Sequence, residues 1–223
     1  MELSELSQEY LDAVNDTNRE QARNSMKKAL EAGYTPEQVV FDVILPSVHQ
    51  LLEAYLKEEV VLTQHFLATK ISEELVDELI QKFQLQTSTD IKVVIGCASG
   101  DFHGLGKKIV IGILKSNMIE AIDLGLNVSA EKFVDEAIKH HANIIGVSSM
   151  MMHTAIGENG PLKVREILQQ RNLDKQIKLI VGGAPYQFDH ELYKKVKADS
   201  WAKNGLEAIS KIKTLFKEIN YAH

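Results

Sequence analysis

The residues best placed to do chemistry lie in one short stretch, "ASGDFHGLG" at positions 98–106, directly after the apolar run "IKVVIGC". A carboxylate, Asp101, and an imidazole, His103, stand two positions apart there among three glycines. Glycines where a strand passes into a helix usually bind phosphate. Here, however, the last glycine is not followed by Lys-Ser or Lys-Thr, and G-x-G-x-x-G is absent. The Asp and the His therefore need another explanation.

Histidine is the commonest protein ligand for metals, and a metal-bound imidazole usually donates its other N–H to a carboxylate. Asp101 is close enough in sequence to accept that hydrogen bond from His103, and a hydroxyl such as Ser148 could then bond Asp101. Such a relay would tune how much charge the imidazole gives to a metal. A zinc site made by protein alone needs two or three more ligands, and no neighbouring residue supplies them. We therefore expect the metal to arrive inside a cofactor that fills most of its coordination sphere.

The elements that must position these residues follow an alternating pattern. Short apolar runs occupy 91–97, 118–123, 143–148 and 177–181, with a weak fifth run near 199–202. Helical patterns lie near 105–117, 129–141, 160–171, 187–197 and 204–219. This alternation predicts the α/β class, with a Rossmann-like, doubly wound, parallel five-stranded sheet over residues 91–223.

Ligand sites in such sheets lie at the carboxyl ends of the strands. Asp101 and His103 follow the first predicted strand, and Ser148 ends the third. Gly182 and Gly183 end the fourth. We therefore expect these residues to gather along one edge of the sheet.

The first part of the chain has a different periodicity. Residues 1–85 show four amphipathic helical patterns with short connections, which favours an antiparallel four-helix bundle. The third of these patterns, near 36–57, contains Pro46, which predicts a kink. The polar residues 86–90 are expected to be a linker between this bundle domain and the domain over 91–223.

Bulk composition excludes several classes of protein. The 223 residues have a net charge of −6, so no basic surface argues for nucleic acid as a partner. The single cysteine, Cys97, excludes a disulfide framework and a cysteine-based zinc site. The acidic start lacks the apolar core of a signal peptide, and no apolar run approaches the ~18 residues that span a membrane. We expect a cytoplasmic protein without a membrane partner.

The motif D-x-H-x-x-G in "GDFHGLG", with Ser148-x-Met150 and Gly182-Gly183 downstream, resembles a known family. The family comprises the cobalamin-binding domains of methionine synthase, of methylmalonyl-CoA mutase and of the corrinoid proteins of methyltransferase systems. The resemblance covers the whole chain, because the helical part is similar to the cap bundle that precedes this domain in methionine synthase and in small corrinoid proteins.

The resemblance implies a role for each matching residue. His103 would be the lower cobalt ligand in place of the cofactor's own base, with Asp101 and then Ser148 as its relay. The glycines 104 and 106 would let the displaced nucleotide tail pass, and Gly182 and Gly183 would line its slot. The remaining expected cofactor contacts are Leu105, Met150 and Trp201. Three positions depart from the family pattern, namely Gly104 for a usual Asp, Met150 for Leu and Met152 for Thr.

The resemblance implies a methyl carrier, inactive alone, that moves a methyl group on cobalt between a substrate-specific methyltransferase and a second methyltransferase. The alternative is a cobalamin-dependent sensor or regulator. Light-sensing members have a bundle Trp followed by Glu-His, whereas this chain has Tyr55 and then Gln64-His65. A mutase subunit is a further alternative, and a homodimer stays open as the assembly state.

Overall fold

The computed structural model describes residues 2–83 and 90–221, without the side chains of positions 56 and 221. Two compact units make up the chain, residues 1–83 and 84–223. Of the predicted linker 86–90, all but Asp90 lies outside the described residues, so that interpretation stays a prediction. No helix in the described part of the chain combines the length and apolar character needed to cross a membrane.

The first unit is helical, as expected. It comprises α1 (Leu3–Asn15), α2 (Arg19–Glu31), α3 (Pro36–Gln38), a π-helical segment η1 (Val39–Ile44), α4 (Leu45–Leu56) and α5 (Leu62–Ile80). The three middle segments follow one another without a break and correspond to the single predicted helix 36–57.

The expected irregularity at Pro46 takes the form of the π-helical segment that precedes it. Proline has no N–H to donate to the preceding turn, so a regular α-helical ladder cannot continue through it. The N–H of Leu45 bonds the carbonyl of Val40, five residues back. The hydroxyl of Ser47 bonds the carbonyl of Val43 at 2.8 Å. A wider turn and a side-chain donor thus compensate for the missing N–H.

The second unit contains a parallel sheet in the order β2-β1-β3-β4-β5. The strands are β1 (Lys92–Ala98), β2 (Glu120–Val128), β3 (Ile144–Ser148), β4 (Lys178–Gly182) and β5 (Ser200–Ala202). This order confirms the Rossmann-like, doubly wound prediction. The direction of winding reverses between β1 and β3, and the crevice at such a switch point is where open sheets bind ligands.

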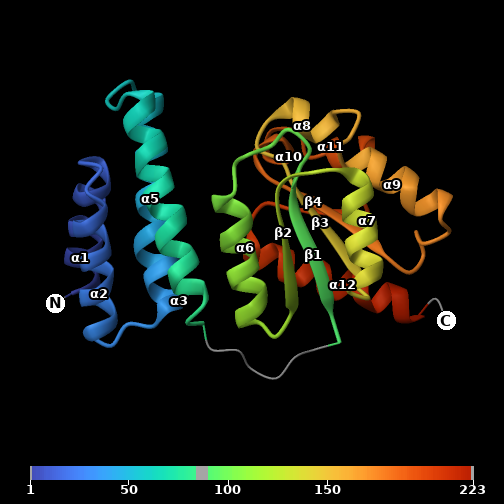
Figure 1. The fold of residues 1–223 in the computed structure, drawn as a ribbon, viewed down its shortest axis with the longest axis horizontal. Coiled ribbons are helices and arrows are strands. Elements are labelled where there is room, and N and C mark those ends of the chain that lie inside the picture. The colour runs from blue at the N-terminus through green and yellow to red at the C-terminus, as the bar shows by residue number, and fades with distance from the viewer. Residues whose placement is uncertain (1, 84–89, 222–223) are drawn as a thin grey trace. The chain divides into compact units, whose positions relative to one another are not determined.

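Helices cover both faces of this sheet (Figure 1). They are α6 (Leu105–Ser116), α7 (Ala130–Lys139), α8 (Met152–Ile156), α9 (Pro161–Gln170), α10 (Ala184–Phe188), α11 (Leu192–Lys195) and α12 (Gly205–Tyr221). Successive residues of β1 point to opposite faces. Val94 joins the core that includes Phe133 of α7 and Leu168 of α9, and Val93 joins the core that includes Leu114 of α6 and Ile212 of α12.

Two predicted elements differ from the structure, and one helix of the structure was not predicted. The expected helix 187–197 is two short helices, α10 and α11, separated by a loop. The helix α8 has no counterpart in the prediction, since five residues are too few to show a helical period. Strand β2 continues five residues past the predicted end at 123, with register shifts against β1 between Ile95 and Gly96 and between Gly96 and Ala98.

Candidate cobalamin site

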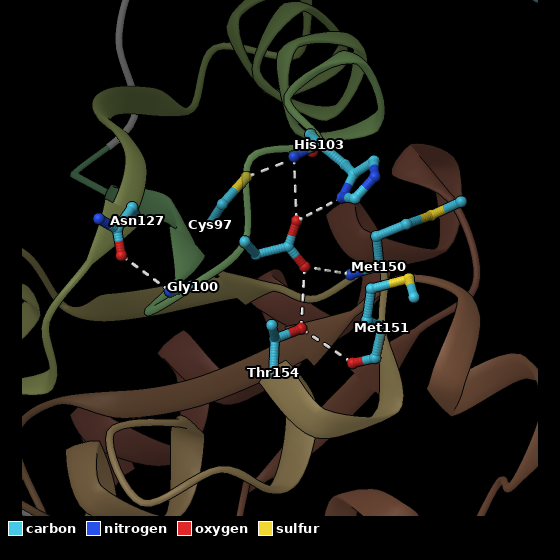
Figure 2. A network of polar contacts seen from close by, with 8 residues as sticks. Cys97, Gly100, His103, Asn127, Met150, Met151 and Thr154 are labelled. Carbon is cyan, nitrogen blue, oxygen red and sulfur yellow. Dashed lines mark hydrogen bonds and ion pairs between the residues drawn. The ribbon is translucent and has the colours of Figure 1, made fainter. Parts of the chain in front are cut away.

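Asp101 is the centre of the site. Its side chain is 1% exposed although it lies in the loop after β1. One carboxylate oxygen, Oδ1, accepts hydrogen bonds from the backbone N–H and from Nδ1 of His103, at 3.0 and 2.9 Å. The other, Oδ2, accepts from the backbone N–H of Met150 at 2.6 Å and from the hydroxyl of Thr154 at 2.9 Å (Figure 2). The carboxylate therefore joins the loops that follow β1 and β3, at the switch point of the sheet.

These contacts favour the ionised form of Asp101. Burial by itself raises the pKa of a carboxyl group, because it disfavours the charge. Here the donors outweigh burial: the backbone N–H groups of Met150 and His103, then the side chains of His103 and Thr154, hold the pKa of Asp101 below its ordinary value. At neutral pH the carboxylate is thus charged and accepts hydrogen bonds only.

The His103 side chain is 57% exposed, in contrast to its partner. With Nδ1 directed at Asp101, the ring nitrogen left for a ligand is Nε2. Among the described residues, no group of three His, Cys, Asp or Glu side chains could hold a metal ion. A metal bound to His103 must therefore bring most of its own ligands.

The relay hydroxyl is a correction to the sequence interpretation. Within the described parts of the chain, the hydroxyl that reaches Asp101 is that of Thr154 in α8, and Ser148 is not among the donors to Asp101. Ser148 instead lies opposite Cys97, its partner in the pairing of β3 with β1. The strand-end position of Ser148 suggested the relay, but the short helix α8 brings a more distant hydroxyl closer.

Cys97, on β1, supports the backbone of the loop that carries His103. Its buried thiol donates to the backbone carbonyl of His103, with a sulfur–oxygen distance of 3.4 Å. Burial raises the pKa of this thiol to about 12, so it remains protonated and keeps its donor at neutral pH.

The glycines fall into two groups by what surrounds them. Gly104 precedes the first residue of α6, Leu105, and a Cβ on Gly106 would meet nothing within 4 Å, so a ligand has room there. Gly183 has φ +112°, and its Cβ would lie 2.0 Å from the backbone oxygen of Ser149. The protein's own backbone therefore requires glycine at 183, and the expected role of Gly183 in lining the slot of the nucleotide tail stays a prediction. On Gly182 a Cβ would lie 3.1 Å from the oxygen of Ala202.

Trp201 lies apart from the Asp101 cluster, on β5. Its ring stacks on His190, with the centroids 4.9 Å apart. Both rings line a surface hollow together with Gln187, Lys203, Asn204 and Glu207. The hollow is at the carboxyl end of the sheet, the same edge as His103.

Apolar and unpaired polar groups surround the site in a way that fits a large flat cofactor. Phe102, which precedes His103 in the chain, is 60% exposed. Met150 and Met151 are 42 and 46% exposed and lie next to His103 and Thr154 (Figure 2). Ser149 Oγ and the Tyr186 hydroxyl are buried, and neither makes a hydrogen bond of good geometry to any described residue. Burial raises the pKa of Tyr186, and the nearby Ser149 offsets only part of that rise. A corrin ring presents an apolar face, so the exposed Phe102, Met150 and Met151 suit it, whereas Ser149 and Tyr186 lie buried beneath the surface.

The bundle residues singled out by sequence lie together within the first unit. Tyr55 stacks on His65, with ring centroids 5.2 Å apart. Nδ1 of His65 is buried and bonds no described residue. The amide of Gln64 donates to the carbonyl of Asn15 at 2.5 Å. The structure thus gives Gln64 a role within the bundle.

Comparison with known proteins agrees with this geometry. Residues 91–210 match the B12 binding domain, and residues 6–80 match a second family of the same description. The chain belongs to the B12-binding family. The expected corrinoid cofactor and the resemblance to corrinoid proteins of methyltransferase systems are confirmed at that level.

Individual relatives cover nearly the whole chain. Trimethylamine corrinoid protein 2 of Methanosarcina acetivorans is 27% identical over 210 residues, 92% of this chain and 94% of its own. The structure of the Methanosarcina barkeri monomethylamine corrinoid protein matches with a TM-score of 0.78 at 22% identity, over 95% of this chain and 99% of that one. A chain of the methanol:cobalamin methyltransferase complex of the same organism matches with a TM-score of 0.50 at 19% identity, over 96 and 84%. The two structural matches establish the fold.

Proposed function

We propose that this chain is a methyl-carrying corrinoid protein. It holds a cobalamin-type corrinoid through His103 and presents it first to a substrate-specific methyltransferase and then to a second methyltransferase. The observation that carries the proposal is the Asp101–His103 pair, in which a buried carboxylate orients an exposed imidazole. The relatives that span the whole chain support it, because they are named as corrinoid proteins for methylamines.

When bound, the corrinoid supplies a cobalt that can accept a methyl group and give it up again. The chain's own residues control the proton and the orientation of the lower ligand. Ionised Asp101 keeps the proton of the neutral imidazole on Nδ1, so Nε2 retains its lone pair for cobalt. Because Met150 and Thr154 hold the other carboxylate oxygen, the group that orients His103 is itself fixed.

The rest of the site would contact the corrinoid. Met150 and Met151 would lie against the macrocycle, because both are exposed beside the loop of His103. The further contacts proposed for the corrin rim and the nucleotide tail are Gly104, Leu105, Gly106, Ser148, Gly182, Gly183 and Trp201.

The ligand assignment is tested by loading the purified chain with hydroxocobalamin and reducing it to the Co(II) form. Electron paramagnetic resonance should show coupling to one axial nitrogen, and labelling the protein's histidines with nitrogen-15 should change that coupling. The variant His103→Ala should lose it, whereas His153→Ala, a matched histidine in α8, should keep it. An axial nitrogen coupling that is unchanged by the nitrogen-15 label would refute ligation by histidine.

The carrier role is tested separately. After chemical reduction and treatment with carbon-14 methyl iodide, the label should remain with the corrinoid-loaded chain and pass to a methyl acceptor only when a methyltransferase is added. A sensor would instead bind adenosylcobalamin in preference and change its oligomeric state on illumination. Light-dependent assembly together with no transferable label would replace the carrier assignment with the sensor.

A further inference from the structure

The carboxyl end of β2 reaches the loop that holds Asp101. Two register shifts between β1 and β2 each give β2 one extra residue, and the second lies where Gly96 pairs with Gly125 and Ala98 pairs with Val128. This bulge places Asn127 beside the turn at Gly100 (Figure 2).

Asn127 makes two hydrogen bonds to that turn, one from its side chain and one from its backbone. Its Oδ1 accepts from the N–H of Gly100 at 2.8 Å. Its own N–H donates to the carbonyl of Asp101 at 2.9 Å. Gly100 and Asn127 have φ of +78° and +51°, a region that glycine and asparagine adopt more readily than other residues. The residue types at both positions therefore fit the contact.

The strand end that carries Asn127 is itself anchored. Asp123 of β2 forms an ion pair with Lys107 of α6, whose side chain is 1% exposed. Asp123 also accepts the N–H of Gly125 at 2.8 Å. Asn127 thus acts from a held strand end, and the loop of Asp101 is bound on one side to β2 and on the other to the loop after β3.

We infer that Asn127 is a positioning residue for the Asp101–His103 pair, an inference that rests on the proposed lower-ligand role of His103. Two carboxylate bonds tie the Asp101 side chain to the β3 side of the crevice. The hydrogen bond between Asp101 Oδ1 and His103 Nδ1 then depends on the position of the backbone at residues 100–101. Asn127 fixes that position through its two hydrogen bonds. Residues that orient a metal-binding histidine through its carboxylate partner change ligand geometry without touching the metal.

The test uses Asn127→Gly, which removes the side chain and still tolerates the positive φ. Asn127→Asp is the rescue variant, because a carboxylate oxygen can accept from the N–H of Gly100. Asn172→Gly is the control: Asn172 also has a positive φ, of +55°, but lies between α9 and β4 at the opposite end of the strands. Unfolding midpoints measured in urea establish that each variant is folded.

The first measurement uses the cofactor-free protein at constant pH. Nitrogen-15 spectra of the His103 ring should show the Nδ1–H tautomer in the wild-type chain and in Asn172→Gly. One lost hydrogen bond shifts a conformational equilibrium about 2- to 12-fold. Asn127→Gly should therefore increase the minor tautomer by that factor, and Asn127→Asp should reverse most of the increase. Unchanged tautomer populations in Asn127→Gly would overturn the inference.

The second measurement uses the corrinoid-loaded Co(II) form. Asn127→Gly should lower the ratio of nitrogen-coupled to uncoupled cobalt by a similar factor, with recovery in Asn127→Asp. Faster hydrogen exchange at Gly100 with an unchanged ratio would mean a structural role alone and would also overturn the inference. If wild-type protein shows no axial nitrogen, the proposed function fails, and the tautomer measurement still decides the role of Asn127.

Discussion

Replacing Gly183 by alanine should destabilise the sheet unit even when no cofactor is present. Gly183 combines φ +112° with a Cβ position 2.0 Å from the oxygen of Ser149. A side-chain-bearing residue in such a backbone conformation costs about 1–3 kcal/mol. Forcing an extra group into a close-packed contact costs about another 1–3 kcal/mol. The two effects together predict a loss of about 2–6 kcal/mol, a large part of the ~5–15 kcal/mol that stabilises a typical domain.

The assay is urea unfolding followed by the fluorescence of Trp201, the single tryptophan of the chain, which lies in β5 and reports on the sheet unit. With a slope of about 2 kcal/mol/M, the midpoint of Gly183→Ala should fall by about 1–3 M. Gly125→Ala is the control for backbone strain alone, since Gly125 has φ +90° and open space around its Cβ position. Gly106→Ala lacks both strain and contact and should be close to neutral. Equal midpoints for Gly183→Ala and Gly125→Ala would refute the predicted backbone contact.

Three further predictions concern the polar network. Asp101→Asn should lower the free energy of unfolding by about 2–3 kcal/mol at neutral pH. Because folding lowers the pKa of Asp101, the stability that the wild type gains from its carboxylate is complete above the unfolded pKa of about 3.9 and is lost as the pH falls through the folded pKa. Urea midpoints of both proteins between pH 2 and 7 would show this. Thr154→Val should lower the free energy of unfolding by about 1–3 kcal/mol and change the nitrogen-15 signals of the His103 ring, whereas Ser148→Ala should leave those signals unchanged. The reverse pattern would restore Ser148 as the relay. Cys97, with a thiol pKa raised to about 12, should react with a disulfide reagent only after unfolding, and a fast absorbance change from the native protein at pH 8 would show that the thiol is accessible or ionised.

Features encoded within a few residues were predictable from sequence. Asp101 and His103 meet inside one turn, so their spacing alone predicted the contact. Pro46 acts on its own helix through its missing N–H, and the irregularity is where the proline predicts it. The alternation of apolar runs and helices likewise predicted the parallel sheet, because each βαβ unit is a local pattern.

Features that depend on residues far apart in the chain were not predictable from the sequence. The contact between Asp101 and Thr154 spans 53 residues and needs α8, which is too short to leave a periodic pattern. The requirement for glycine at 183 comes from the backbone of Ser149 on the neighbouring strand end, which no local spacing reveals. In the first case a strand-end serine was assigned the role that the tertiary structure gives to Thr154. In the second, the backbone requirement adds to the ligand slot, which stays a prediction.

The sheet order nevertheless indicates where such distant partners lie. Since β1 stands between β2 and β3, any loop after β1 is flanked by the residues at and just beyond the carboxyl ends of those two strands. Asn127 and Thr154 occupy these two flanks, and each bonds the turn or the carboxylate of Asp101. In a sheet with this order, a ligating residue in the loop after the first strand is therefore expected to have its supports near the ends of the second and third strands. The polar residues within about six positions of those ends are the ones to test. A variant at either flank that left the His103 ring unaffected would show that the loop after β1 holds its own geometry.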